Sequence, residues 1–163
     1  SKNKALDLLN FVMEKQCQLV IDWMRVGFIH GVMNTDNTAI SGETIDYGPC
    51  AFMNTYNPAT VFSSIDENGR YAYKNQPYIG SWNLSKLAET LLPLFSSNVN
   101  TAVDIANNEL KLFEAKFKEF WYKEMSLKLG LLSTENTDKE LIDEYLFILD
   151  FYFLLKYYDF EAR

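Results

Sequence analysis

A mainly α-helical single domain is the fold class that the sequence predicts. Apolar residues recur at helical spacing in the stretches 4–26, 83–94, 100–129 and 138–158, which make up about half of the chain. Strand-like alternation is confined to short pieces within residues 38–46. With 163 residues, of which 48% are hydrophobic, the chain has the size and composition of one domain with a packed core.

The charge balance and the apolar runs exclude two classes of partner. The chain holds 15 basic and 22 acidic residues, a net charge of −7. This acidity disfavours sequence-independent binding of nucleic acid, which needs a basic surface, and adhesion to anionic membranes. The most apolar run, Tyr145 to Tyr158, has 14 residues, whereas a spanning helix needs about 20. We therefore expect a helix of the core or of an interface there, and neither nucleic acid nor membrane as a partner.

The first helix is predicted over residues 4–26. Its apolar positions lie on one face, and Gly27 follows as a stop signal. The two cysteines, Cys17 and Cys50, lack the spacing of a metal site, so we expect free thiols in a reducing compartment rather than a disulfide. The apolar residues that define the helix are Leu8, Leu9, Val12, Leu19 and Trp23.

A hairpin and a long loop are predicted next. Thr38–Ile40 and Thr44–Asp46 are β-prone and flank Gly42, which would supply the positive φ of a tight turn. Residues 49–80 hold three of the four prolines and many Asn, Ser and Tyr residues, and are expected to form an irregular loop. A loop of this length inside a compact domain usually has a function.

Helices are predicted to resume near Asn83 and to continue to the end of the chain. The first of them has leucines on one face and ends at Pro93. A long helix follows over about 100–129, and the last one spans about 138–158. A capping box opens that last helix, with Thr137 at the N-cap and Glu140 three residues on.

The polar residues that could carry chemistry fall in the segment before residue 49. The cluster His30 to Asn37 precedes the predicted hairpin, and Asp46 lies at the hairpin's far end. A hairpin brings its ends together, so Asn37 and Asp46 are expected to converge. Amide and carboxylate oxygens suit Mg²⁺, which takes few protein ligands and completes its shell with water and phosphate. In kinase-type sites, a loop Asn and the Asp of an Asp-Phe-Gly turn hold Mg²⁺ in this way.

One position departs from the kinase pattern. Small-molecule kinases often carry a His-Gly-Asp-x-x-x-x-Asn loop, and here Val32 stands in the slot of the Asp, while Asp36 offers a carboxylate from the same loop. His30 is expected to brace backbone and Asn34 to hold a turn. Tyr47 is expected to pack in the position of the kinase Phe. Taken alone, the pattern leaves open a pseudokinase-like binding or scaffold module and an ordinary phosphotransferase that uses Asp36.

The run from Gly27 to Leu94, with HGVMNTDN followed by IDYGP, resembles the selenoprotein O family, called YdiU in bacteria. The resemblance implies a protein-kinase-like fold and transfer of AMP from ATP to hydroxyl side chains of proteins. It implies that Asp36 accepts the proton, and that Asn37 and Asp46 hold Mg²⁺, or Mn²⁺ in its place, with Asp46 close to the ATP phosphates.

The resemblance also implies how the chain divides and what it lacks. The whole of 1–163 would be one partial domain, the helical C-terminal lobe, with 27–48 as catalytic loop and hairpin and 49–80 as a loop similar to an activation segment. No G-x-G-x-x-G loop or strand lysine precedes the catalytic loop. We therefore expect a fragment of a longer enzyme that alone is inactive, binds ATP poorly and self-associates through exposed core. The family is cytoplasmic in bacteria and mitochondrial in eukaryotes.

Overall fold

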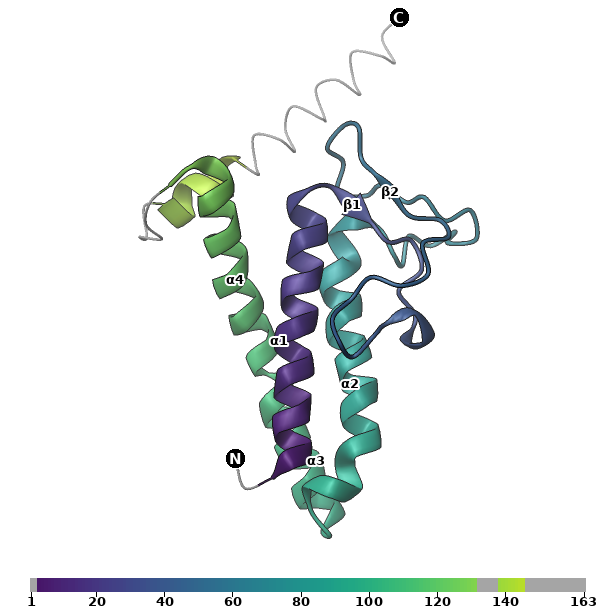
Figure 1. The fold of residues 1–163 in the computed structure, drawn as a ribbon, viewed down its shortest axis with the longest axis vertical. Coiled ribbons are helices and arrows are strands. Elements are labelled where there is room, and N and C mark those ends of the chain that lie inside the picture. The colour runs from purple at the N-terminus through teal and green to yellow at the C-terminus, as the bar shows by residue number, and fades with distance from the viewer. Residues whose placement is uncertain (1–2, 132–137, 146–163) are drawn as a thin grey trace, which may run out of the picture.

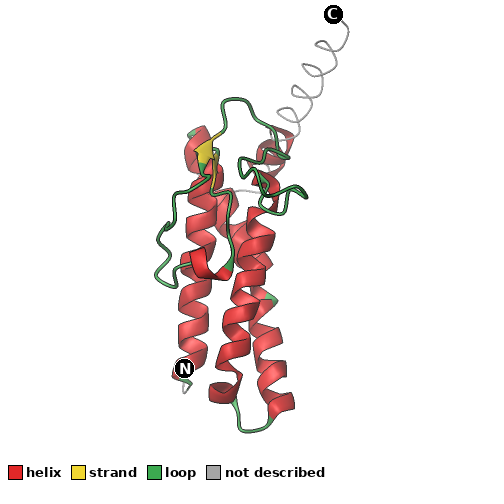
Figure 2. Ribbon diagram, turned by 90° about the vertical axis from the view of Figure 1, so that its right-hand side faces the viewer, coloured by secondary structure: helices red, strands yellow, loops and turns green. Residues whose placement is uncertain are grey.

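The computed structural model, which describes residues 3–131 and 138–145, is mainly helical, as predicted. Helix α1 lies between α2 and α4, and α3 packs against α2 at the lower end of the bundle (Figure 1). Figure 2 shows that the long loops gather around the upper half of the bundle. The helices are α1 (Lys4–Arg25), α2 (Gln76–Phe95), α3 (Val99–Leu110) and α4 (Leu112–Leu129).

Helix α1 is the centre of the core, and its predicted extent is confirmed. The side chain of Asn3 caps its N-terminus by accepting hydrogen bonds from the backbone N–H groups of Ala5 and Leu6. Its buried face contacts α2 on one side and α4 on the other. Because α1 is packed along its whole length, it forms a rigid support for the segment that follows it. Its most deeply buried apolar residues are Leu9, Met13, Cys17, Val20 and Ile21.

The predicted hairpin within residues 38–46 is wrong. The only strands in the described part of the chain are β1 (Phe28–Ile29) and β2 (Ala51–Phe52), which pair antiparallel, Phe28 with Phe52 and Ile29 with Ala51. The pairing of β1 with β2 brings the two ends of residues 30–50 together. The one helical element within these residues is the 3₁₀ turn η1 (Thr35–Asn37). The polar cluster and Asp46 therefore lie on one closed loop rather than at the ends of a hairpin.

Contacts with α1 explain why residues 38–46 do not form strands. Nε2 of Gln16 donates a hydrogen bond to the carbonyl oxygen of Ala39 over 2.7 Å, and Nε1 of Trp23 donates to Oγ1 of Thr44 over 2.8 Å. Gly42 does have the positive φ that was predicted, 78°, but for a different purpose. A Cβ at this position would lie 2.7 Å from Cβ of Lys15, so the glycine allows the loop to lie directly on α1.

The later helices differ from the prediction at their ends. Helix α2 begins at Gln76, seven residues before Asn83, because the turn η2 (Tyr73–Asn75) leads into it and a proline follows its first residue. Pro93 lies inside α2, which ends at Phe95. The helix predicted over 100–129 is divided at Lys111 into α3 and α4, so that α3 can pack on α2 while α4 packs on α1.

The last predicted helix is seen in part. Residues 138–145 are helical, and Oη of Tyr122 on α4 hydrogen-bonds the carboxylate of Asp143 at 3.0 Å. Thr137 and residues 146–158 lie outside the described residues, and so does most of the apolar run. In the described part of the chain, no helix combines the length and apolarity needed to cross a bilayer. Both cysteines are free thiols, as predicted.

Candidate active site

The turn η1 places Asp36 and Asn37 side by side. Asn34 caps its N-terminus, and Oδ1 of Asn34 accepts a hydrogen bond from the backbone N–H of Asn37 over 3.0 Å. The prediction that Asn34 holds a turn is confirmed. The side chain of Asp36 is exposed, and that of Asn37 is half-buried. The turn therefore presents a carboxylate to solvent next to a partly shielded amide.

The amide group of Asn37 has a fixed orientation. Its Nδ2 donates a hydrogen bond to the carbonyl oxygen of Val32 over 3.2 Å. A carbonyl only accepts, so the nitrogen must face Val32 and Oδ1 must face the other way. No hydrogen bond reaches this Oδ1 from the residues that the structure describes. Val32 thus contributes its backbone carbonyl to the site. Its side chain, which stands in the slot of the kinase Asp, takes no part in this hydrogen bond.

His30 joins the polar cluster to the residue before Asp46. Its side chain is buried, and its Nε2 lies 2.7 Å from the carbonyl oxygen of Ile45. Because that carbonyl can only accept, Nε2 carries the proton, and Nδ1 is left to accept a long hydrogen bond of 3.4 Å from the backbone N–H of Val32. The prediction that His30 braces backbone is confirmed.

Asp46 adopts an unusual backbone conformation directly after this brace. Its φ is 55°, and among the described residues no other non-glycine residue has a positive φ. Aspartate tolerates this left-handed region better than most residues, yet the conformation still costs free energy. The side chain is exposed, and its Oδ1 lies 3.5 Å from where a Cβ on Gly48 would stand. Two contacts hold the chain on either side of Asp46. His30 binds the carbonyl of Ile45 before it, and Gly31 packs against Pro49 after it.

The second anchor is a close packing of the two motif segments. Gly31 has a φ of 86°, and a Cβ there would lie 3.0 Å from Cγ of Pro49 and 3.2 Å from its carbonyl oxygen. Only a glycine allows this approach without a shift of the proline. The structure thus brings residues 30–32 and 45–49 together. Whether Oδ1 of Asn37 and the carboxylate of Asp46 face a single ion stays a prediction.

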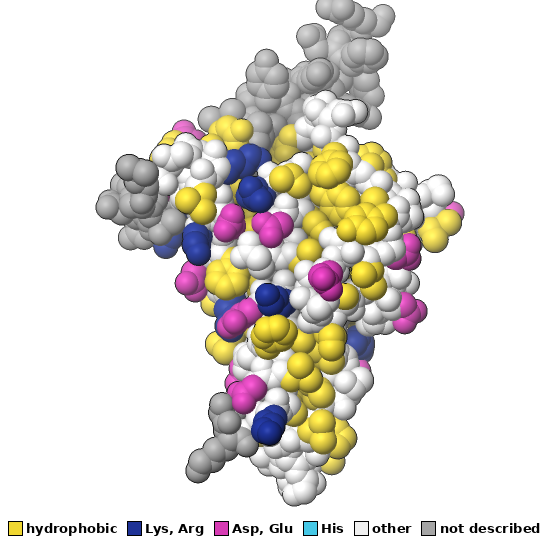
Figure 3. Space-filling model, viewed as in Figure 1, with side chains coloured by type: hydrophobic (Ala, Val, Ile, Leu, Met, Phe, Trp, Pro, Cys, Tyr) yellow, Lys and Arg dark blue, Asp and Glu magenta, His cyan; other side chains and the backbone are white. Residues whose placement is uncertain are grey.

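The expected packing of Tyr47 is wrong. Tyr47 is 66% exposed and directly follows Asp46, whose φ is positive. Hydrophobic side chains also gather at the surface over the loop region beside β1 and β2, as Figure 3 shows. The exposed aromatic and aliphatic residues of residues 45–65 are Ile45, Tyr47, Phe52, Phe62 and Ile65.

Two buried amides on α2 support the site, and the sequence analysis missed both. Oε1 of Gln76 accepts from the backbone N–H of His30, and its Nε2 donates to the carbonyl of Phe28, each over 3.1 Å. Nδ2 of Asn83 donates to the carbonyl of Met33 over 3.0 Å and to Oγ1 of Thr38 over 2.8 Å. The two amides are seven residues apart, two helical turns on one face. Polar residues with this spacing on an apolar face were the signal that could have revealed them.

The donor set fits Mg²⁺ better than a transition metal. Within the described residues, no group of three or more His, Cys, Asp or Glu side chains is placed to hold a metal ion. Mg²⁺ needs no such cage, since it binds one or two oxygen ligands and keeps water or phosphate on its other positions. The oriented Oδ1 of Asn37 and the exposed carboxylate of Asp46 are oxygen donors of the type that Mg²⁺ takes.

Comparison with known proteins points to one family. The profile described as "Protein adenylyltransferase SelO" matches residues 1–160. Curated proteins named "Protein nucleotidyltransferase YdiU" are similar to the chain: one from Pelagibacter ubique is 63% identical over 146 residues, and one from Bacillus cytotoxicus is 58% identical over 147. A third, from Rhizobium rhizogenes, is 54% identical over 148 residues. These alignments cover 90–91% of the chain, and the chain spans about 30% of the length of each relative.

Proposed function

Because the chain belongs to the SelO family, we propose that it carries the catalytic loop and metal-binding turn of a protein adenylyltransferase. In a protein of the relatives' length, the reaction is transfer of AMP from ATP to the hydroxyl group of a Ser, Thr or Tyr side chain of an acceptor protein. The observation that carries the proposal is the packing of residues 30–32 against 45–49, which joins the two family motifs in one place.

Asp36 is the proposed proton acceptor. Its carboxylate is exposed on η1, so an incoming hydroxyl group can reach it. As the hydroxyl oxygen bonds to the α-phosphorus of ATP, its proton moves to a carboxylate oxygen of Asp36. The bond from the α-phosphorus to the bridging oxygen breaks, and pyrophosphate leaves. Phosphoryl chemistry of this kind depends on positioning and charge neutralisation more than on covalent help from the protein.

Asn37 and Asp46 are the proposed metal ligands. Oδ1 of Asn37, turned away from Val32, and the carboxylate of Asp46 would hold Mg²⁺, or Mn²⁺ in its place. When bound, the ion would neutralise charge on the ATP phosphates. Asp46 would then lie close to the nucleotide. In this proposal residues 27–48 are the catalytic loop of a protein-kinase-like C-terminal lobe, and 49–80 take the place of an activation segment.

The experiment that tests the proposal uses the full-length protein with ATP labelled at the α or the γ phosphate, in the presence of Mg²⁺ and an acceptor protein extract. Label that enters protein from the α position alone is the expected result. Label from the γ position alone would establish an ordinary phosphotransferase that uses Asp36. No label from either position would favour the inactive binding or scaffold module, in which Val32 in the slot of the kinase Asp means that the catalytic base is missing.

Asp46→Ala provides the variant for this assay, and Asp104→Ala is its matched control. Both remove an exposed carboxylate, but Asp104 lies on α3, away from the motif segments. We expect Asp46→Ala to abolish incorporation of label and Asp104→Ala to leave it unchanged. Equal activity of the two variants would remove the assignment of Asp46.

A further inference from the structure

Two cationic side chains meet at a single tryptophan on the surface of α2. Cζ of Arg70, from the loop before the helix, lies 4.8 Å from the centre of the Trp82 ring, and Nζ of Lys86 lies 5.5 Å from it. The guanidinium group of Arg70 also lies over the ring of Tyr71, at 5.7 Å. The negative faces of these rings attract both cations and hold them in place. Arg70, Trp82 and Lys86 form what we call the cationic cluster.

The guanidinium group of Arg70 is positioned by the loop but has no anionic partner. The carboxylate of Asp66 accepts hydrogen bonds from the backbone N–H groups of Arg70 and Tyr71, each over 2.8 Å, and this fixes the backbone there. Glu67 lines the same surface cavity as Arg70. Within residues 3–131 and 138–145, however, no ion pair or side-chain hydrogen bond engages this guanidinium. Its planar N–H donors are therefore left for an oxyanion from outside.

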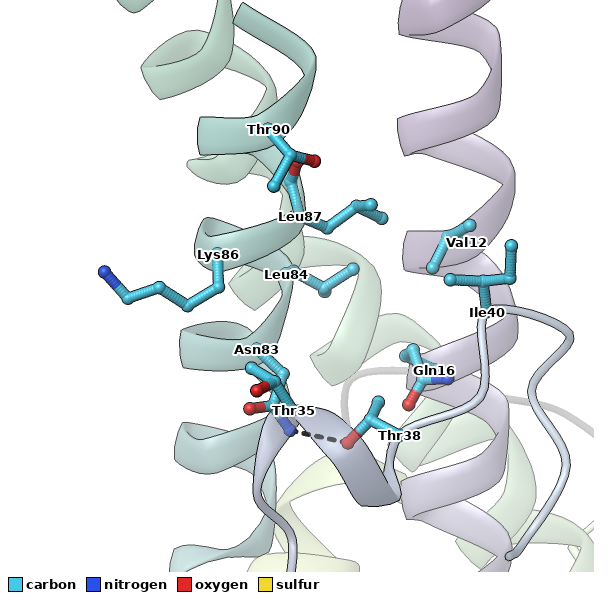
Figure 4. A pocket seen from close by; sticks show the side chains of 10 residues that line it. All are labelled: Val12, Gln16, Thr35, Thr38, Ile40, Asn83, Leu84, Lys86, Leu87 and Thr90. Carbon is cyan, nitrogen blue, oxygen red and sulfur yellow. Dashed lines mark hydrogen bonds between the residues drawn. The ribbon is translucent and has the colours of Figure 1, made fainter.

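Lys86 presents its charge at the surface in a similar way. It stands at the rim of a pocket of about 290 Å³ between α1, α2 and the loop that carries η1, and Figure 4 shows its amino group directed away from that pocket. The amino group pairs with Glu89 at 2.7 Å, but both side chains are largely exposed. A surface pair of this kind is weak, so the ammonium group can also attract a carboxylate of another protein.

The cationic cluster lies beside the turn that carries Asp36. Asn83, the residue after Trp82, donates hydrogen bonds to the carbonyl of Met33 and to Oγ1 of Thr38, which stand on either side of η1. A protein that brings a hydroxyl group to Asp36 therefore approaches next to the cluster.

The sequence around the cluster makes its charge distinctive. Arg70 is the only Arg or Lys between Arg25 and Lys74, whereas the whole chain has a net charge of −7. An acidic partner is repelled by most of this chain, so complementary charge at the cluster determines where such a partner settles.

We propose that the cationic cluster binds an acidic stretch of the acceptor protein, an inference that rests on the proposed function. One Asp or Glu carboxylate would take two parallel N–H groups of Arg70, and a second would lie near the ammonium group of Lys86. The ring of Trp82 would pack against the stems of these acidic side chains. The substrates would then be proteins that carry acidic residues close to the hydroxyl group that receives AMP.

The test is an NMR titration of the ¹⁵N-labelled 163-residue chain with three peptides. They are acetyl-Ala-Glu-Ser-Glu-Ala-amide and its two counterparts in which both Glu are Gln or both are Lys. We expect the Glu peptide to cause saturable shifts in the indole N–H signal of Trp82 and the Nε–H signal of Arg70. The Gln peptide should bind at least fivefold more weakly, and the Lys peptide should cause no saturable shift. Equal binding of the Glu and Gln peptides, or no saturable shift with the Glu peptide, would overturn the proposal.

A titration with Mg²⁺ and ATP separates an acceptor site from a nucleotide site. We expect ATP to leave both signals in place at concentrations at which the Glu peptide saturates them. Saturation of the same signals by ATP at lower concentration would assign Arg70 to the nucleotide and overturn the proposal. Because no transfer of AMP is measured, these titrations fail or succeed apart from the labelling experiment that tests the proposed function.

Variants of the two cations check that the cluster is the place of binding. Lys86→Gln and Lys118→Gln are matched, since each removes an exposed lysine that pairs with a glutamate about one helical turn away. We expect binding of the Glu peptide to weaken at least fivefold in Arg70→Gln and threefold in Lys86→Gln, and to change less than twofold in Lys118→Gln. Arg70 is exposed, so its variant should keep the fold. Equal binding by Arg70→Gln and Lys118→Gln would contradict the proposal.

Discussion

Nε2 of His30 donates a hydrogen bond to the carbonyl oxygen of Ile45 over 2.7 Å, so a buried ring fixes the backbone directly before Asp46. The ring packs in a cluster with Trp23 and Phe28, with centroid distances of 5.2 Å and 6.5 Å. The geometry of an exposed carboxylate therefore depends on the core.

Replacing His30 by Ala should destabilise the fold. The change leaves a cavity beside Trp23 and Phe28 and removes the partners of two backbone groups, which together cost about 2–4 kcal/mol. Urea denaturation followed by circular dichroism measures the free energy of unfolding. Tyr47→Ala is the control, since that exposed side chain should contribute less than about 0.5 kcal/mol. A His30→Ala variant as stable as the control would show that the brace has no structural role.

Gly42→Ala should also destabilise the fold. Alanine would be strained at a φ of 78°, and its Cβ would lie 2.7 Å from Cβ of Lys15, so we expect a loss of about 1–3 kcal/mol. Gly48→Ala is the matched control, because its nearest contact would be an ordinary 3.5 Å to Asp46. Thermal unfolding of both variants measures the difference. If Gly42→Ala melts at the same temperature as Gly48→Ala, the loop does not lie on α1 as described.

Cys17 should resist alkylation in the folded protein, whereas Cys50 should react. Burial raises the pKa of the Cys17 thiol to about 12, and the reactive species is the thiolate. Cys50 is partly exposed. Iodoacetamide at pH 8, followed by peptide mass spectrometry, should label Cys50 first and Cys17 only after urea is added. Labelling of Cys17 in the native protein at the rate seen in urea would contradict its burial.

Stability should fall as the pH rises above about 9. The Cys17 thiol has a pKa of 9.0 when exposed and about 12 in the fold, so the unfolded chain loses this proton first. The stabilisation is therefore complete below pH 9 and is lost between pH 9 and 12. Burial raises the pKa of Tyr73 in the same direction. Urea midpoints from pH 8 to 11 measure the fall, which Cys17→Ala should make less steep. An identical slope in the variant would remove the thiol as a cause.

Asp36→Asn should slow transfer from α-labelled ATP by about 100- to 10,000-fold in the full-length protein, the range typical of a lost general base. Because Asp36 is exposed, the variant should keep the stability of the parent chain. Incorporated label per unit time is the measurement, with thermal unfolding beside it. Full activity in this variant would assign the proton to another acceptor.

The helices were predictable because apolar residues recur at the spacing of one helix face, and that face is the one that the fold buries. Helix α1 was predicted nearly to the residue, since its apolar positions recur at helical spacing and Gly27 follows it. The start of α2 was missed because residues 76–82 mix polar and aromatic residues and the helix begins beside a proline. The hairpin was mispredicted because β-propensity at Thr38–Ile40 and Thr44–Asp46 is outweighed by contacts with α1, and sequence spacing does not show such contacts.

The candidate site was predictable only as a set of residues. The motifs indicated Asp36, Asn37 and Asp46, but spacing could not show that a carbonyl of Val32 orients Asn37. The buried amides Gln76 and Asn83 come from a helix more than 40 residues away in sequence, so only the fold shows that they support the loop. Tyr47 was mispredicted because it was placed by analogy with the kinase Phe, and sequence spacing does not show which side chains the loop leaves exposed.

The small sheet that β1 and β2 form has a consequence for engineering. It fixes both ends of residues 28–52 at one point, while Lys15, Gln16 and Trp23 hold the middle of the loop against α1. The smallest unit that would preserve this geometry in a foreign scaffold is therefore the loop together with α1 and α2, because α2 supplies the Gln76 and Asn83 amides that hold the loop's first half.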